Sequence, residues 1–121
     1  QKNFHEFRCN PFLMVDKTET EEILQKTNDN VCLLIDVAHL KVSAKTLNFS
    51  PENYLLYFKE ATEAYHLSDN HGLEDSNELI KSDAWFWPHI NTKLDYYSLE
   101  IYNINPKVLK QQLELTYRFL S

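Results

Sequence analysis

Two short apolar runs, each followed by side chains of the kinds that bind metals, constrain the fold of this chain more than any other feature. The first run covers residues 31–35 and is followed by Asp36 and His39. The second covers residues 64–69 and contains a histidine and an aspartate of its own. A segment with helical character separates them, so the order is strand, helix, strand. Parallel α/β proteins build their sites where such strands end, and we expect a site at this edge of a sheet.

The flanking segments extend this pattern into an α/β fold. Ser50 followed by Pro51 is a helix start, because serine caps the first turn and proline fits the first helical position. Asn105 followed by Pro106 marks another, whose helix should bury an apolar side. Alternating strands and helices predict a parallel sheet made of β/α units. We expect helices over residues 16–27, 50–62 and from 105 onward, and strands over 31–35, 64–67 and 96–102, with a partial strand before residue 15. Residues 40–49 should form a loop, with room for one short helical turn, and residues 70–92 a long connection.

Charge, glycine and cysteine content exclude several classes of function. The 121 residues carry a formal net charge of -6, which argues against sequence-independent binding of DNA or RNA. The single glycine, Gly72, rules out glycine-rich phosphate loops. No apolar run approaches the ~18 to 20 residues of a membrane helix. Two isolated cysteines, of which Cys32 should be a buried thiol, indicate a reducing compartment and a cytoplasmic protein.

Three polar side chains lie in or directly after the expected strands, namely Asp36, His66 and Glu100. A charged group in such a place is costly unless it is paired, hydrogen-bonded or bound to a metal. Each has an ordinary explanation: the aspartate could cap a helix, the histidine could bond to backbone in the core, and the glutamate could pair with Lys or Arg. Three neighbouring strands that each offer such a group are a stronger signal than any one alone. Mixed oxygen and nitrogen ligands suit Mn, Mg, Zn, Co or Fe.

Two further candidates lie in or near the long loop that follows the second strand. Asp69 could contact a ligand or could open the turn after that strand. Trp85 begins an aromatic run that could stack on a sugar ring or pack the loop onto the body. The acids at positions 74, 75, 78 and 83 are most simply solvated loop charges.

Three motifs occur in a recognisable order along the chain. Residues 34–39 have the pattern apolar-Asp-x-x-His, residues 65–70 contain His-Leu-x-Asp, and residues 99–100 are a leucine and a glutamate. These motifs resemble those of strands six, seven and eight in the xylose-isomerase-like TIM-barrel superfamily. That superfamily includes sugar isomerases, sugar epimerases and apurinic endonucleases.

The resemblance implies roles for individual residues. Asp36, His66 and Glu100 would be ligands of a divalent metal ion, and Glu100 could also be an acid/base in the epimerase branch. His39 would bind substrate in the isomerase branch, or a second metal in the endonuclease branch. Asp69 would orient a ligand or a substrate hydroxyl group.

The resemblance also implies that residues 1–121 form a single partial domain, the C-terminal half of a (β/α)8 barrel with about strands 5–8. A complete barrel needs ~250 residues. The chain would therefore be a fragment, or a half that a homodimer completes. The family's strand-five glutamate has no clear counterpart. The Asp-x-His that many members carry after strand seven is Asp75-Ser76-Asn77 here, and the accompanying glycines are missing.

These features lead to one expected function and two alternatives. We expect a metal-dependent isomerase or epimerase that acts on a sugar or sugar phosphate, present here as an inactive fragment. The first alternative is a non-catalytic, degenerate barrel that binds a ligand or a partner. The second is an abasic-site endonuclease, which the acidic charge and the lost Asp-x-His disfavour. Neither a membrane partner nor nucleic acid is expected.

Overall fold

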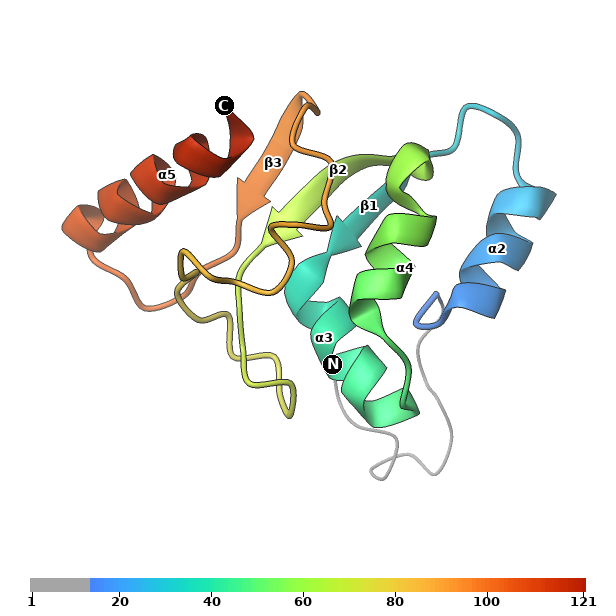
Figure 1. Cartoon of the computed structure of the whole chain (residues 1–121), viewed down its shortest axis with the longest axis horizontal. Coiled ribbons are helices and arrows are strands. Elements are labelled where there is room, and N and C mark those ends of the chain that lie inside the picture. Colours follow the sequence, from blue (N-terminus) through green and yellow to red (C-terminus); the bar gives the residue numbers. More distant parts are fainter. Residues whose placement is uncertain (1–13) are drawn as a thin grey trace.

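A three-stranded parallel sheet forms the centre of the protein, as the computed structural model of residues 14–121 shows (Figure 1). The strand order is β1-β2-β3, with helices around it, and the predicted α/β fold with parallel β/α units is confirmed. The partial strand expected before residue 15 lies almost entirely outside the described residues. The elements in chain order are α2 (Lys17–Lys26), β1 (Leu33–Asp36), α3 (Val37–Leu47), α4 (Pro51–Tyr57), the 3-10 helix η1 (Lys59–Ala61), β2 (Thr62–Leu67), β3 (Tyr96–Leu99) and α5 (Pro106–Leu120).

The predicted helix starts are where the capping residues place them. The Ser50 hydroxyl accepts a hydrogen bond from the backbone N–H of Asn53, and Pro51 is the first residue of α4. At α5, the side chain of Asn105 accepts from the N–H of Val108 in the same way. Helix α4 ends at Tyr57, earlier than predicted, and η1 leads from it into β2.

The expected loop over residues 40–49 is wrong, because an eleven-residue helix, α3, occupies most of it. Asp36 caps its start, and Asn48 ends it in the left-handed conformation, with φ of 58°. Six of its residues are buried, so packing on the sheet stabilises a helix that the sequence signalled only weakly. The buried residues are Val37, Ala38, Leu40, Val42, Ser43 and Ala44.

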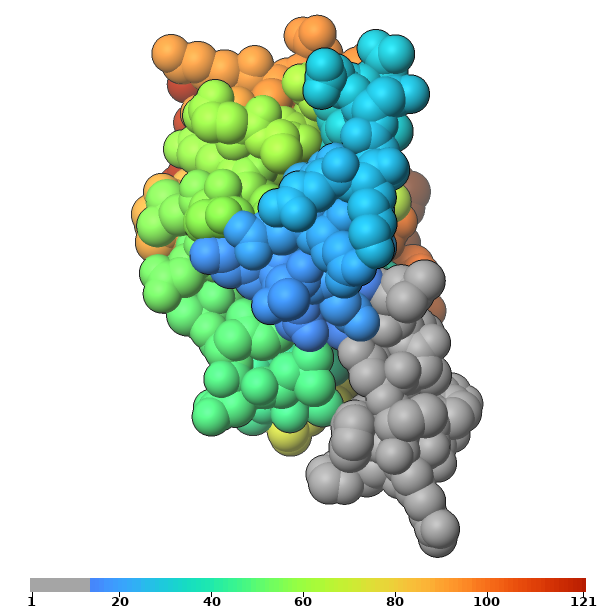
Figure 2. Space-filling view, turned by 90° about the vertical axis from the view of Figure 1, so that its right-hand side faces the viewer, coloured from blue at the N-terminus to red at the C-terminus, as the bar shows by residue number. Residues whose placement is uncertain are grey.

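One face of the sheet carries the core. Alternate residues of β1 and β2 point to it, including Ile35, Tyr65 and Leu67, and all three are buried. Helices α3 and α4 cover this face, and Figure 2 shows α2 lying against their outer surface. Phe86 and Ile90 from the long connection before β3 complete the cluster. The connection therefore has a packing role that its aromatic content had suggested.

The opposite face of the sheet is open. The register places Leu34, Ala64 and Tyr96 side by side on it, with Leu34 53% and Tyr96 71% exposed. Parallel sheets are normally covered on both faces. Within residues 14–121, β1 and β3 also have no strand on their outer sides. An open face and two free edges are what a partial β/α unit would leave.

Helix α5 lies beyond β3, on the side away from β2 (Figure 1). Its apolar stripe was expected to be buried, but Leu109, Leu113 and Tyr117 are exposed. Its buried polar residue Gln112 instead bonds to the backbone of Ile80, accepting from the N–H at 2.8 Å and donating to the carbonyl at 3.1 Å. The helix thus contacts the long connection through this side-chain amide and through Phe119, whose ring stacks on Trp87 with centroids 4.5 Å apart.

Within residues 14–121, three asparagines occupy left-handed backbone positions, namely Asn48, Asn77 and Asn103. Asparagine tolerates this region better than most residues because its short polar side chain can bond locally. Gly72 has φ of 86°, and a Cβ there would lie 3.1 Å from the Lys45 side chain. The one glycine therefore lies where both conformation and space favour it.

Two smaller observations complete the fold. Cys32 is exposed, so the expectation of a buried thiol is wrong: it precedes β1 and lies outside the sheet core. No helix within the described range is long and apolar enough to span a bilayer.

Candidate metal site

The three residues predicted as metal ligands lie together at the carboxyl ends of the three strands. Asp36 is the last residue of β1 and is directly opposite His66 of β2 in the register. Glu100 follows β3 and is held there by its backbone N–H, which donates to the carbonyl of Leu67 at 3.0 Å. The predicted strand over residues 96–102 is therefore too long by three residues. Its glutamate is at a strand end rather than inside the strand.

The distances within this cluster suit a small cation. One ligand atom from each of Asp36, His66 and Glu100 can be chosen so that all lie within 4.8 Å of one another. The Nδ1 atom of His66 is 2.9 Å from Oε1 of Glu100 and 3.8 Å from Oδ2 of Asp36. The side chains of His66 and Glu100 are 31% and 30% exposed, so the cluster is reachable from solvent. Glu100 thus has a histidine as its partner, where a Lys or Arg had been the ordinary expectation.

Asp36 uses its two carboxylate oxygens differently. Oδ1 accepts a hydrogen bond of 2.9 Å from the backbone N–H of His39 and so caps α3, as the capping explanation predicted. Oδ2 is buried and has no hydrogen-bond partner among residues 14–121. Buried polar atoms are nearly always bonded, and an unbonded carboxylate oxygen is costly. An oxygen that faces an imidazole and a second carboxylate fits a divalent cation.

His39 connects this cluster to the loop after β2. Its Nε2 lies 2.6 Å from Oδ2 of Asp75, and its Nδ1 lies 3.4 Å from Oδ2 of Asp36. Both ring nitrogens therefore face carboxylates. Asp75 was expected to be a solvated loop charge, but it is only 23% exposed, and its Oδ1 is buried without a hydrogen-bond partner in the described part of the chain. The one signal for it in the sequence was its position in the altered Asp-x-His motif.

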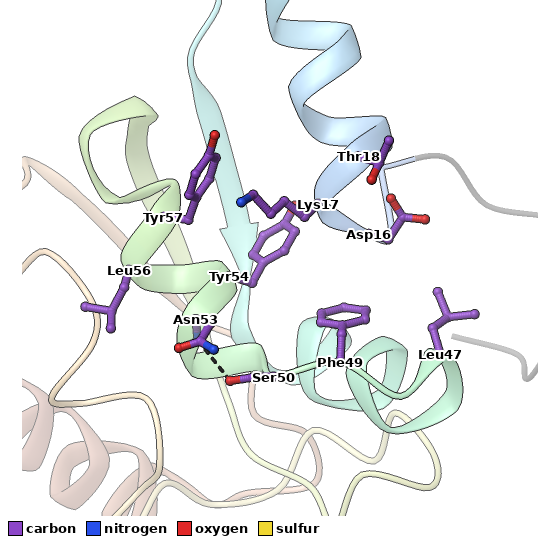
Figure 3. A pocket seen from close by; sticks show the side chains of 10 residues that line it. All are labelled: Asp16, Lys17, Thr18, Leu47, Phe49, Ser50, Asn53, Tyr54, Leu56 and Tyr57. Atoms are coloured by element: carbon purple, nitrogen blue, oxygen red, sulfur yellow. Dashed lines mark hydrogen bonds between the residues drawn. The ribbon is translucent and has the colours of Figure 1, made fainter.

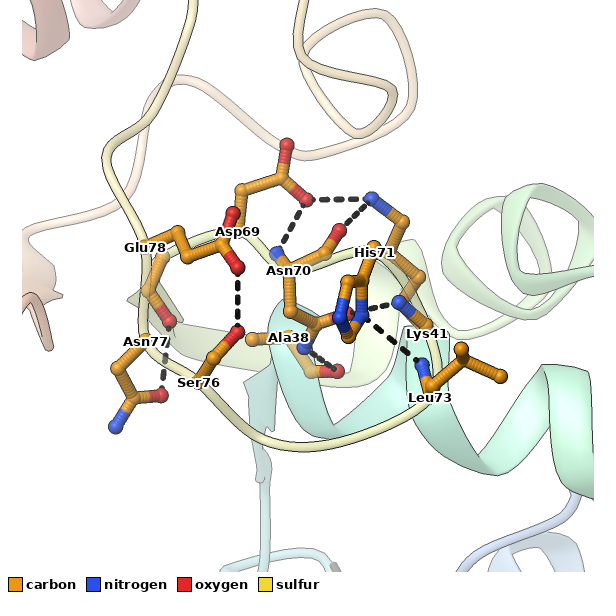
Figure 4. Close-up of polar contacts among 11 residues, drawn as sticks. Ala38, Lys41, Asp69, Asn70, His71, Leu73, Ser76, Asn77 and Glu78 are labelled. Carbon is orange, nitrogen blue, oxygen red and sulfur yellow. Dashed lines mark hydrogen bonds and ion pairs between the residues drawn. The ribbon is translucent and has the colours of Figure 1, made fainter.

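The other predicted substrate contacts, Asp69 and Trp85, make their contacts with residues other than the three ligands. Oδ1 of Asp69 is 2.7 Å from the ammonium of Lys41, and the same oxygen accepts from the N–H of Asn70 (Figure 4). Trp85 is half-buried and packs edge-on against Phe86. Its indole Nε1 is buried with no hydrogen-bond partner in the part of the chain that is described. In this arrangement Asp69 anchors the loop, and Trp85 packs it.

A large cavity lies elsewhere. It has a volume of about 970 Å³ and lies between the start of α2, the end of α3 and α4 (Figure 3). Tyr54 and Tyr57 form part of its wall, and the Lys17 ammonium lies 3.4 Å from the centre of the Tyr57 ring. None of the three candidate metal ligands lines it. We therefore assign the chemistry to the strand ends, where charged and metal-binding groups converge, and not to the larger hollow.

Comparisons of this chain with models of protein families, with curated proteins and with solved structures found no match. The family resemblance therefore rests on the three motifs alone.

Proposed function

We propose that this chain carries the metal-binding part of a divalent-metal-dependent isomerase or epimerase that acts on a sugar or sugar phosphate. The observation that carries the proposal is the convergence of Asp36, His66 and Glu100 at the strand ends, with the buried Oδ2 of Asp36 lacking a bond within residues 14–121. Carboxyl ends of parallel strands are where β/α proteins place their catalytic groups. The motif resemblance supports the choice of reaction class.

The donor set fits Mn, Zn, Co or Mg, since it offers two carboxylate oxygens and one imidazole nitrogen. Asp36 and His66 would hold the ion from adjacent strands, and Glu100 would complete the protein ligands from the third. When bound, such an ion polarises a carbonyl or hydroxyl oxygen of the sugar. Three protein ligands leave coordination positions open to substrate.

Glu100 is also the best placed of the three to move a proton. Its Oε1 lies 2.9 Å from Nδ1 of His66, and its side chain is 30% exposed, so the carboxylate is open to solvent. A carboxylate within reach of the substrate can take a proton from the carbon next to the carbonyl group and return it. His39 is less suited to this role, because its Nε2 is paired with Asp75 at 2.6 Å and its Nδ1 faces the Asp36 carboxylate at 3.4 Å, beyond a good hydrogen bond.

Metal titration tests the proposal directly. Isothermal titration with Zn²⁺, Mn²⁺ and Co²⁺ should show about one ion per chain. Glu100→Gln and His66→Asn should each lower the affinity by at least about tenfold, the scale seen for groups that support a metal site. Glu63→Gln is the matched control, because Glu63 lies on the same strand as His66 but is exposed. Stoichiometric binding that survives all the ligand variants would place the ion elsewhere, and absence of binding would overturn the proposal.

A second measurement separates an enzyme from a binding protein. A longer protein that includes this chain would be incubated with aldoses, ketoses and their phosphates in the presence of Mn²⁺ or Co²⁺. Isomer or epimer formation would be followed by NMR spectroscopy, and Glu100→Gln should abolish it. Metal binding without turnover of any sugar would favour the non-catalytic barrel, and cleavage of an abasic duplex would favour the nuclease.

A further inference from the structure

The loop between Asp69 and Glu78 is fastened at its base and along one side. At its base, the backbone groups of these two residues bond to each other in both directions, at 3.1 Å and 2.7 Å. Along its side, it is tied to the first turns of α3 (Figure 4). The loop between these points carries Asp75, which reaches His39. The hydrogen bonds between this loop and α3 therefore determine whether the Asp75 carboxylate can reach the His39 ring.

Asn70 makes the most buried of these ties. Its side chain is almost inaccessible and uses both of its polar atoms. The amide nitrogen donates to the carbonyl of Ala38 at 3.0 Å, and the amide oxygen accepts from the N–H of Gly72 at 2.8 Å. One bond fixes the loop to α3, and the other fixes the turn at Gly72. Both are needed to define the path of the chain toward Asp75.

Lys41, one turn further along α3, makes the second tie. Its ammonium donates to the side chain of Asp69 and to the backbone carbonyl of Asn70. Ala38, His39 and Lys41 lie within the first five residues of α3. The helix that presents His39 to the metal ligands thus also holds the loop that presents Asp75 to His39.

We propose that Asn70 is a positioning residue: it fixes the loop to α3 so that Asp75 holds His39 against the carboxylate of Asp36. Asn70 ends the 65–70 motif but was assigned no role from sequence, because its role depends on the fold that brings Ala38 and Gly72 to it. The effect on metal affinity rests on the proposed function. The His39–Asp75 contact itself does not, and it can be measured without any metal.

The test uses Asn70→Asp, which has the same shape and keeps an acceptor for Gly72 but loses the donor to Ala38. The readout is the His39 imidazole, followed by long-range ¹H–¹⁵N NMR correlations in metal-free protein. In the wild type, Nε2 should carry a proton shared with Asp75, a tautomer that this experiment observes directly. Asn70→Asp should shift the His39 nitrogens toward the values of Asp75→Asn, in which His39 loses its charged partner.

Two further variants keep the result decisive. Lys41→Met removes the bonds from Lys41 to Asp69 and Asn70, at a more exposed position. It should shift the His39 nitrogen signals in the same direction, and it replaces Asn70→Asp as the test if that variant does not fold. Ser76→Ala alters the same loop outside the ties, because the Ser76 hydroxyl donates to the exposed Glu78 side chain, and should leave His39 as in the wild type. Unchanged His39 signals in folded Asn70→Asp would overturn the proposal.

Metal titration of the same variants distinguishes the two proposals. If both hold, Asn70→Asp weakens Zn²⁺ binding several-fold, and Asp75→Asn weakens it by about tenfold. If the wild type binds no Zn²⁺ while the His39 signals still respond, the positioning role stands, and the proposed metal function falls. If Zn²⁺ binds and neither variant changes His39 or the affinity, the positioning role falls alone.

Discussion

His66 and Glu100 meet at the ends of neighbouring strands, with Nδ1 and Oε1 2.9 Å apart, although 33 positions separate them in the sequence. The parallel register of β2 and β3 and the backbone bond from Glu100 to Leu67 create this contact. Asp36 joins it from β1 because it is opposite His66. The contact is therefore a property of the sheet, and a change to the sheet should also change the cluster.

The first prediction concerns the two roles of Asp36. Asp36→Asn keeps an oxygen for the cap on α3 and replaces the unbonded oxygen by an amide donor. The free energy of unfolding should stay within about 1 kcal/mol of the wild type, while Asp36→Ala should lower it by about 1 kcal/mol through loss of the cap. Zn²⁺ binding should be lost in both. Urea unfolding and calorimetric titration check this, and an Asn variant that binds Zn²⁺ like the wild type would remove Asp36 from the ligand set.

The second prediction concerns alkaline unfolding. Burial raises the pKa of the Tyr65 phenol above its usual value of 10.0, and burial does the same for Tyr54. Above pH ~10 the unfolded chain releases these protons before the folded chain does, so it binds fewer protons and the free energy of unfolding falls as pH rises. Their contribution is complete below that pH and is lost as the pH approaches the folded-state pKa.

Tyr65→Phe should therefore make the fall above pH ~10 shallower, as followed by urea unfolding at a series of pH values. Absorbance at 295 nm reports tyrosine ionisation in the same samples. Tyr117→Phe, which changes an exposed ring, is the control and should keep the wild-type slope. Equal slopes for all three proteins would show that Tyr65 is not responsible.

The third prediction tests how α5 recognises the long connection. Gln112→Met keeps the length of the side chain but leaves the N–H and the carbonyl of Ile80 without their partner. Buried unpaired groups cost roughly 1–3 kcal/mol each, so we expect a loss of about 2–4 kcal/mol in the free energy of unfolding. Gln111→Met, at the exposed neighbouring position, should change it by less than about 0.5 kcal/mol. Similar losses for both variants would mean that helix propensity, and not the amide, matters.

The fourth prediction separates the two faces of β1. Leu34→Thr on the open face should change the free energy of unfolding by less than about 1 kcal/mol and should reduce binding of a hydrophobic dye. Ile35→Thr, on the adjacent residue that points to the core, should cost about 2–4 kcal/mol. Equal losses in the free energy of unfolding for the two variants would show that Leu34 is buried in solution.

The sequence predicted the α/β class and the starts of α4 and α5, because serine or asparagine followed by proline defines a helix start locally. It also predicted which three residues of the strand ends would lie together, since acids and histidines at the ends of consecutive parallel strands meet at one edge. Their roles as metal ligands stay a prediction.

Other features could not be read from local pattern. Helix α3 was missed because its stability comes from burial of residues such as Val37 and Leu40 on the sheet. Asp75 was missed because its contact with His39 depends on a loop path that Asn70 and Lys41 define. The prediction of which side of α5 is buried was wrong. Gln112 is buried because it bonds to the backbone of Ile80, and a buried glutamine has no apolar signature in the sequence.

The left-handed asparagines have a consequence for the denatured chain. Glycine would adopt these φ values with no steric cost, but a glycine-rich unfolded chain has more backbone conformations to lose on folding. Asparagine at positions 48, 77 and 103 has a higher conformational energy in the folded state than glycine would have. It also leaves the unfolded chain with fewer backbone conformations. Relative to glycine, part of the stability at these positions therefore comes from the restricted freedom of the unfolded polypeptide, which no contact of the native structure reveals.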